Sequence, residues 1–264
     1  VFTVCCHDTA SAVFAVPADQ PGRAYLSSGT WSLLGVEIPQ PLINAESLAA
    51  NFTNEGGFNG SIRFLKNIMG LWILQECRRE WESAGTALGY GELARLAEKE
   101  APFVAFLDVN SEDFLFPGDM PGKIARFCRR TGQRVPEGIG AMVRVILESL
   151  ALEYRSCLER FEGILGSTIE VLHVVGGGSQ NETLAHFTAD ATGKTLVCGP
   201  VEATSLGNIG VQMIASGRIA GRKEFHELVN RSCALRSVEP CMKHGWDDAY
   251  EKFLAVKERS SARI

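Results

Sequence analysis

The sequence predicts an α/β fold with parallel strands joined by crossover helices, and three observations support it. An apolar run at 168–175 is typical of a buried strand. A glycine-rich turn, GGGSQN at 176–181, follows that run and leads into an expected helix at 182–192. A second strand at 194–198 and a helix at 202–216 repeat the pattern. Because strand–helix–strand alternation joins parallel strands, we expect a central sheet flanked by helices.

The rest of the chain predicts shorter strands, several helices and one domain over 1–264. The expected strands are at 1–6, 24–28 and 31–38, with two short strands and turns within 51–65. Helices are expected at 8–16, 67–84, 90–99, 122–130, 137–165 and across most of 224–257. Between these elements, Gly29-Thr30 predicts a tight hairpin turn, Gly199-Pro200 a turn, and 101–121 a packed irregular excursion.

Composition is that of an ordinary globular protein. Hydrophobic residues make up 45% of the 264 residues and charged residues 22%. The net charge of −5 argues against a nucleic-acid partner, because binding the phosphate backbone needs a basic face. The basic run Arg126, Arg129, Arg130 predicts a solvated helix face. No apolar run spans a membrane and no signal peptide is visible, so we expect a cytoplasmic protein. The first residue is Val1 within an expected strand, which suggests that sequence was removed upstream.

Cysteine spacing predicts neither a zinc site nor a disulfide framework. The eight cysteines include no CxxC pair, and no His stands at zinc-finger distance from a cysteine pair. We expect buried, reduced thiols. Cys233 and Cys241, near the end of the chain, are the one pair that could form a bridge.

Four positions carry groups suited to chemistry, each with a structural alternative. Asp8, beside His7 at the end of an expected strand, could accept a proton from a hydroxyl, or it could only cap the following helix. The turn at Thr30 offers a hydroxyl and amide N–H groups to phosphate oxygens, or is simply a hairpin turn.

The other two positions lie later in the chain. In GGGSQN the glycines would let a ligand approach the backbone at the start of a helix, or only shape the turn. Asn67 and Gln75, eight residues apart, would share one side of the helix expected at 67–84, facing a ligand or at the margin of its apolar face. Gly207 and Gly210 are expected to let their helix press closely against another element.

Together and in this order, these segments resemble the FGGY family of carbohydrate kinases, and within it the rhamnulokinase group most. The matching segments are HDTASAV (7–13), YLSSGTWSLLGVE (25–37), TNEGG (53–57), LKNIMGLWILQE (65–76), VGGGSQN (175–181) and GPVEATSLGNIGVQ (199–212). The resemblance implies the second of two actin-like (ribonuclease H-like) ATPase domains, with a mixed central sheet flanked by helices. It also implies that the N-terminal, sugar-binding domain is absent from this chain.

The resemblance further implies roles for individual residues. Asp8 would be the catalytic base, with His7, Thr9 and Asn67 near the sugar. The nucleotide contacts would come from four residues: Thr30, Gln75, Gly177 and Asn181. The substrates would be ATP, with Mg²⁺, and a small sugar, L-rhamnulose. Because half of the cleft is missing, we expect the isolated chain to be inactive.

Two features leave alternatives open. Cys5-Cys6 precedes His7 where the family usually has a small residue such as Gly, which puts the shape of that turn in question. Sugar contacts lie mainly in the missing half, so another ketose or polyol kinase of the same family is the first alternative. The second is a non-catalytic actin-like nucleotide-binding domain, which would have no use for a base at Asp8.

Overall fold

The computed structural model describes residues 2–5, 7–17, 22–241 and 244–261, and the chain divides into two compact units. The first unit comprises Val1–Asn67, Cys157–Gln180 and Lys194–Val238. The second comprises Ile68–Ser156, Asn181–Gly193 and Glu239–Ile264. Each unit is described separately below. The expectation that 1–264 acts as a single domain stays a prediction.

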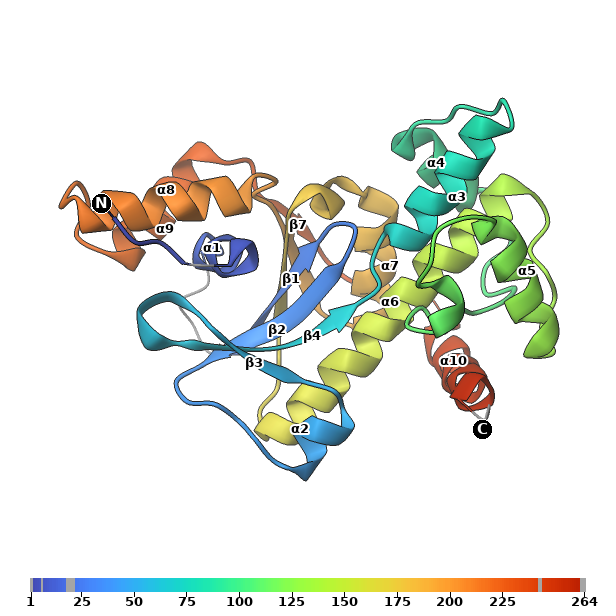
Figure 1. The fold of residues 1–264 in the computed structure, drawn as a ribbon, viewed down its shortest axis with the longest axis horizontal. Coiled ribbons are helices and arrows are strands. Elements are labelled where there is room, and N and C mark those ends of the chain that lie inside the picture. Colours follow the sequence, from blue (N-terminus) through green and yellow to red (C-terminus); the bar gives the residue numbers. More distant parts are fainter. Residues whose placement is uncertain (1, 6, 18–21, 242–243, 262–264) are drawn as a thin grey trace. The chain divides into compact units, whose positions relative to one another are not determined.

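The first unit is built on a mixed seven-stranded sheet, which confirms the predicted α/β class (Figure 1). Its strand order is β3-β4-β2-β1-β5-β6-β7. The parallel pairs are β1 with β5 and β5 with β6; the antiparallel pairs include β1 with β2, β3 with β4 and β6 with β7. The strands are β1 (Arg23–Ser28), β2 (Ser32–Ile38), β3 (Thr53–Gly56), β4 (Ile62–Ile68), β5 (Val171–Val175), β6 (Thr195–Cys198) and β7 (Arg236–Val238).

Helices pack on both faces of this sheet. On one face, α1 (Asp8–Phe14), α8 (Ala203–Ala215) and α9 (Arg222–Ser232) enclose a core with Tyr25, Leu65 and Val175 of the strands. Figure 1 shows α1 (blue) beside α8 (orange), from opposite ends of the sequence. Phe64 alternates with Leu65 along β4 and so faces the other way, where it packs edge-on against Phe52 and Phe161. Phe161 belongs to the last turns of α6 (Gly138–Leu165), and the short α2 (Ala45–Ala49) follows β2 in the chain.

The second unit is helical. Its helices are α3 (Trp72–Ser83), α4 (Tyr90–Glu98), α5 (Met120–Arg130), the first part of α6, α7 (Glu182–Thr192) and α10 (Trp246–Ser261). The expected irregular excursion after α4 is confirmed. Backbone N–H groups there donate to buried side chains of α6: Phe103 N to Glu148 Oε2 at 2.9 Å and Leu107 N to Ser149 Oγ at 2.9 Å. These bonds satisfy backbone groups that no regular element pairs.

Three predictions about elements were wrong. Residues 2–5 form no strand, while Val1 and Cys6 lie outside the described residues. The helix expected at 67–84 begins only at Trp72, because residues 62–68 form strand β4, which lies between β3 and β2 in the sheet. The stretch 224–257 is not one helical run, since β7 separates α9 from α10 by pairing with β6. Two short strands were expected within 51–65, but local sequence pattern did not show that the second extends to Ile68 or that β7 forms, because both depend on pairing within the sheet.

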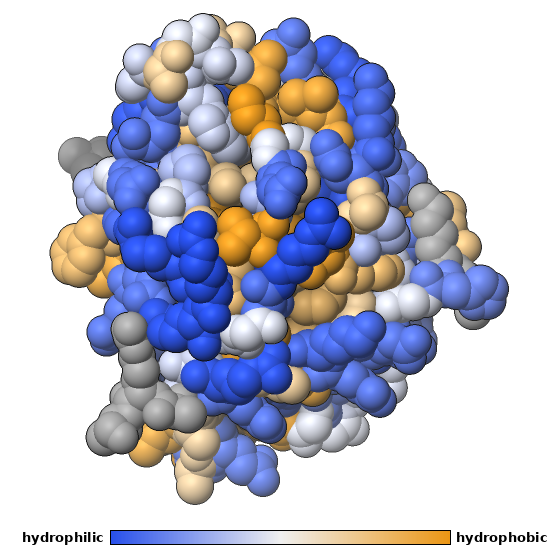
Figure 2. Space-filling model, turned by 90° about the vertical axis from the view of Figure 1, so that its right-hand side faces the viewer, coloured by the Kyte–Doolittle hydropathy of each residue, from blue (hydrophilic) through white to orange (hydrophobic). Residues whose placement is uncertain are grey.

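The surface and the cysteines agree with the composition. The face in Figure 2 is mostly hydrophilic, with apolar patches between polar ridges. Among the described residues no helix has the length and hydropathy needed to span a membrane. The described cysteines include Cys233 and Cys241, whose thiols are free, so those two form no bridge. Four of them are buried as expected: Cys77, Cys128, Cys157 and Cys198. Burial raises the pKa of the Cys128 thiol to about 11.

Candidate functional site

The carboxyl ends of the parallel strands β1 and β5 meet at one edge of the sheet. Ser27 of β1 is in register with Val175 of β5, so the loops that leave both strands emerge side by side. After β1, Gly29, Thr30 and Trp31 form the hairpin loop to β2, with Gly29 N donating to Trp31 O at 2.9 Å. This confirms the predicted turn, in which the Thr30 side chain is exposed. Such edges are where α/β sheets bind ligands.

The glycine-rich loop after β5 contains glycines with different roles. A Cβ on Gly176 would lie 2.8 Å from Ser28 O, and its φ of +84° favours glycine. A Cβ on Gly178 would overlap Ser28 Oγ and lie 2.7 Å from Ser28 Cβ. Gly177 is exposed, and nothing lies within 4 Å of the place where its Cβ would be. Gly177 is therefore the glycine whose backbone a ligand could approach closely.

The loop after β6 closes on the same edge. Gly199 N donates to Val174 O at 2.8 Å, and Gly176 N donates to Pro200 O at 3.3 Å. Within the glycine-rich loop, Ser179 Oγ donates to Gly176 O at 2.7 Å. These bonds hold the Gly177 backbone in place before any ligand arrives. Preorganised amide groups of this kind suit a phosphate or a polar ring edge.

Asp8 is the first residue of α1 and is exposed. No hydrogen bond or ion pair joins its carboxylate to another described residue. His7 caps the helix, its Nδ1 accepting a hydrogen bond from Thr9 N at 3.2 Å, while Thr9 itself is buried. Helix capping, the structural alternative for Asp8, is thus carried out by His7. The Asp8 carboxylate is left open to a ligand.

The position of α1 is set by α8. A Cβ on Gly207 would overlap Ser11 O and lie 2.6 Å from Ser11 C, so the two helix backbones touch. A Cβ on Gly210 would lie 2.5 Å from the Phe225 ring of α9. The expectation that these glycines allow close packing is confirmed, although each faces a different helix.

The direction of α1 decides where Asp8 lies. Val13, in the last turn of this helix, and Val16, two residues beyond its end, line a pocket beside Gly22, Arg23 and Ala24 at the amino end of β1. The helix therefore runs back along the sheet, from the carboxyl ends of the strands toward their amino ends. Asp8 at its start lies toward the edge that carries Thr30 and Gly177.

The pair Asn67 and Gln75 does not form as predicted. Asn67 is an exposed residue of β4 in the first unit, whereas Gln75 is a half-buried residue of α3 in the second. They share no helix face, because β4 extends through Ile68. Asn181 also belongs to the second unit, where its Oδ1 accepts a hydrogen bond from Leu184 N at 2.9 Å and caps α7.

Ser28 was not among the predicted site residues, yet it lies at the centre of this edge. It is the last residue of β1, is 2% exposed, and its Oγ has no hydrogen-bond partner in the described structure. The sequence SSGT offered no signal for it, because its contacts with Gly176 and Gly178 come from residues about 150 positions away.

The described residues contain no cluster of three or more His, Cys, Asp or Glu side chains that could hold a metal ion. The described residues therefore offer no all-protein site for Mg²⁺. Mg²⁺ commonly binds through one or two carboxylates together with substrate phosphates. With no such cluster among the described residues, Mg²⁺ would be held chiefly by the phosphates of the nucleotide and would arrive with it.

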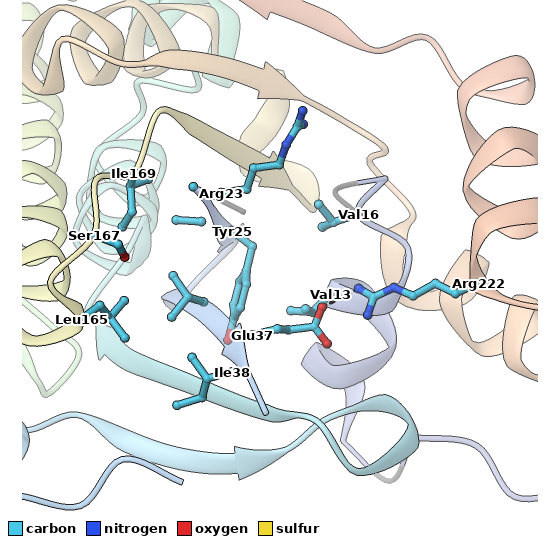
Figure 3. Close-up of a pocket in the computed structure, with 13 residues that line it drawn as sticks. Val13, Val16, Arg23, Tyr25, Glu37, Ile38, Leu165, Ser167, Ile169 and Arg222 are labelled. Atoms are coloured by element: carbon cyan, nitrogen blue, oxygen red, sulfur yellow. Dashed lines mark hydrogen bonds and ion pairs between the residues drawn. The ribbon is translucent and has the colours of Figure 1, made fainter. Parts of the chain in front are cut away.

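A separate pocket of about 240 Å³ lies at the opposite edge of the sheet (Figure 3). Tyr25 points from β1 toward Glu37, and Arg222 reaches Glu37 from α9 to form an ion pair. Burial raises the pKa of the Tyr25 phenol above its ordinary value. The pocket is lined by the amino end of β1 and the end of α1, so it includes none of Asp8, Thr30 and Gly177.

Comparison with known proteins agrees with this architecture. Solved structures share the fold at low sequence identity. A xylulose kinase from Rhodospirillum rubrum matches with a TM-score of 0.69 and 16% identity, over 95% of this chain and 50% of that one. A Plasmodium falciparum glycerol kinase, solved with ADP, matches with a TM-score of 0.69 and 15% identity, over 97% and 51%. The actin-like fold expected from the sequence is confirmed.

Curated relatives are closer in sequence. A rhamnulokinase of Bacteroides thetaiotaomicron is 47% identical over 96% of this chain and 51% of its own length. A rhamnulokinase of Bacillus subtilis is 41% identical over 91% and 49%. The chain thus spans about half the length of the curated relatives it matches. Residues 24–216 match the model of the C-terminal domain of the FGGY family of carbohydrate kinases, and the chain therefore belongs to that family.

Proposed function

We propose that this chain is the half of a cytoplasmic sugar kinase that supplies the catalytic base and much of the nucleotide site. The reaction is ATP-dependent phosphorylation of L-rhamnulose to L-rhamnulose 1-phosphate. The sugar is inferred from the rhamnulokinase relatives at 41–47% identity. The partner is an N-terminal domain carried on the same polypeptide, which would account for relatives about twice as long. Without that domain the chain does not turn over.

One observation carries the proposal. An open carboxylate, Asp8, and two exposed loop positions, Thr30 and Gly177, lie toward the same edge of one sheet. A phosphoryl transferase needs a base at the attacking hydroxyl and amide or hydroxyl donors at the phosphates. A hairpin turn or helix cap alone would not need the Asp8 carboxylate to stay unpartnered.

The chemical step follows from these positions. Asp8 accepts the proton of the primary hydroxyl of the sugar as its oxygen forms a bond to the γ-phosphorus of ATP. The bond from the γ-phosphorus to the β,γ-bridging oxygen breaks, and ADP leaves with that electron pair. Thr30 and the backbone of Gly177 hold the nucleotide in line with the hydroxyl, which is most of what phosphoryl transfer requires. Mg²⁺, when bound with ATP, neutralises phosphate charge.

Other residues take positioning roles in this proposal. His7 and Thr9, beside the base, and Asn67 on β4 are assigned to the sugar. Gln75 and Asn181 are assigned to the nucleotide. Of these, Thr9 is buried and Asn181 already caps a helix, so each would act through the shape it gives its loop.

The test is Asp8→Asn in the full-length kinase, with Asp248→Asn as its matched control. Both aspartates are exposed and lie in the first turn of a helix, but Asp248 belongs to α10 of the second unit. We expect Asp8→Asn to lower kcat about 10³-fold, since general-base catalysis contributes roughly that much, with ADP affinity retained. Asp248→Asn should keep normal turnover. Unchanged turnover in Asp8→Asn would remove Asp8 from the mechanism.

The same assay separates the alternatives. A different ketose or polyol kinase would show a higher kcat/KM for another sugar than for L-rhamnulose. A non-catalytic nucleotide-binding domain would bind ADP but would phosphorylate no sugar in a panel of ketoses and polyols. Measuring ADP binding and sugar-dependent ADP release on one preparation distinguishes the three.

A further inference from the structure

Ser28 contacts both glycines that flank Gly177. Its main-chain oxygen lies where a Cβ on Gly176 would need space, at 2.8 Å, and its side chain fills the space of a Cβ on Gly178. These contacts join the end of β1 to the loop after β5, all within the first unit. The distance of Gly177 from β1 is therefore determined by what stands at position 28.

Ser28 is also two residues before Thr30 on the same strand end. A shift of the glycine-rich loop away from Ser28 would move Gly177 away from the Thr30 turn. These are the two loop positions assigned above to one nucleotide. A change of 1 Å between groups that hold one substrate can lower the rate about a hundredfold.

The Ser28 hydroxyl does not act through a hydrogen bond. Its Oγ is fully buried and has no partner among the described residues. Because it is enclosed by protein, it does not reach a ligand either. What remains is its volume, which fits into the hollow left by the missing side chain of Gly178.

We propose that Ser28 is a positioning residue whose side chain, seated against Gly178, sets the spacing between the Thr30 turn and the Gly177 backbone and thereby the affinity for the nucleotide. This inference rests on the proposed function. It adds a residue that touches neither substrate.

The experiment changes the two residues that contact each other, Gly178 and Ser28. Gly178→Ala in the full-length kinase places a methyl against Ser28 and should push the loop outward. Ser28→Gly removes both side-chain atoms that the methyl would meet, leaving Ser28 O at 3.0 Å. We expect Gly178→Ala to raise the KM for ATP about tenfold or more while the KM for the sugar stays within about twofold. The double variant Ser28→Gly/Gly178→Ala should recover most of that loss.

Two glycine variants serve as controls. The methyl added by Gly177→Ala meets no protein atom within 4 Å. Any rise it causes in the KM for ATP therefore reflects contact of that methyl with the nucleotide, and Ser28→Gly should not correct it. Gly163→Ala, exposed on α6 with nothing within 4 Å, should leave both KM values unchanged. Thermal unfolding midpoints of every variant separate loss of folded protein from loss of affinity.

If Gly178→Ala does not fold, Ser28→Thr supplies the same test from the other side. Its added methyl enlarges the buried side chain, and we again expect a higher KM for ATP with an unchanged KM for the sugar. A wild-type KM for ATP in both Gly178→Ala and Ser28→Thr would overturn the inference, and so would a rise in Gly178→Ala that Ser28→Gly leaves uncorrected. The proposed function would fail separately, if the full-length wild-type kinase neither bound ADP nor phosphorylated a sugar.

Discussion

Gly207 and Gly178 of the first unit serve a different purpose from Gly193 of the second. In the first unit, Gly207 and Gly178 lie where backbones or side chains of distant segments touch, and a Cβ would overlap Ser11 or Ser28. In the second unit, Gly193 ends α7 with a φ of +67° and has no atom within 4 Å of its Cβ position. At Gly207 and Gly178 the missing side chain allows contact between segments, whereas at Gly193 it allows a turn. Gly207 and Gly178 are therefore less tolerant of added volume than Gly193 is.

The strongest test of this contrast is Gly207→Ala. The new methyl would meet the main chain of Ser11, which cannot rotate away as a flexible side chain could. Overpacking of this kind should lower the free energy of unfolding by about 3 kcal/mol. Gly163→Ala, in the open on α6, should instead raise it by about 0.5–1 kcal/mol through helix propensity. Urea unfolding measures both, and equal effects would remove the contrast.

The units also differ in the buried group that titrates. Burial, helped by the Arg23 charge and by His226, lowers the pKa of His173 on β5 to about 4. The neutral imidazole therefore stabilises the first unit above pH 6.5, and this is lost as pH falls toward 4. Burial of Glu148 on α6 outweighs the Arg144 charge and raises its pKa to about 7. The stability linked to its protonated form is complete below pH 4.5 and is lost as pH rises to 7.

Substitutions that remove each titratable group should change the pH dependence of stability in opposite directions. The unfolding free energy of His173→Gln minus that of wild type should increase as pH falls from about 6.5 to 4.5. The same difference for Glu148→Gln should increase as pH rises over that range. We expect each swing to be on the order of 2 kcal/mol. Urea unfolding at several pH values gives the slopes. Parallel slopes for the two variants would show that the units do not differ in this respect.

The smallest expected effect is at Gly193. Alanine there meets no neighbour but must adopt a left-handed backbone, which should cost about 1 kcal/mol in unfolding free energy. Gly193→Asn should cost less, because asparagine tolerates that conformation better. If Gly193→Ala cost as much as Gly207→Ala, a packing contact rather than backbone conformation would explain both glycines.

Much of the fold was predictable where local pattern and pairing agree. The run at 168–175, the glycine turn and the next helix appear as β5, the loop after it and α7, because apolar periodicity and cap residues act locally. Asn67 was placed on a helix because apolar residues around it recur at helical spacing. The structure instead places it in strand β4, which lies between β3 and β2 and extends through Ile68. Strand β7 was missed for the same reason, since three residues carry little pattern and depend on β6.

The candidate site, too, was predicted in part from local sequence and decided in part by tertiary structure. Residue types alone suggested Asp8, Thr30 and the GGGSQN turn, each with a structural alternative, and the family resemblance singled out Gly177. The placement of Thr30 and Gly177 after adjacent strand ends required the register of β1 with β5, and the placement of α1, which begins at Asp8, required its contact with α8. Only the tertiary structure separated Gly177, which is open, from its neighbours, and it alone revealed Ser28. The physical reason is that space around a residue is set by segments far away in the chain, which no local pattern records.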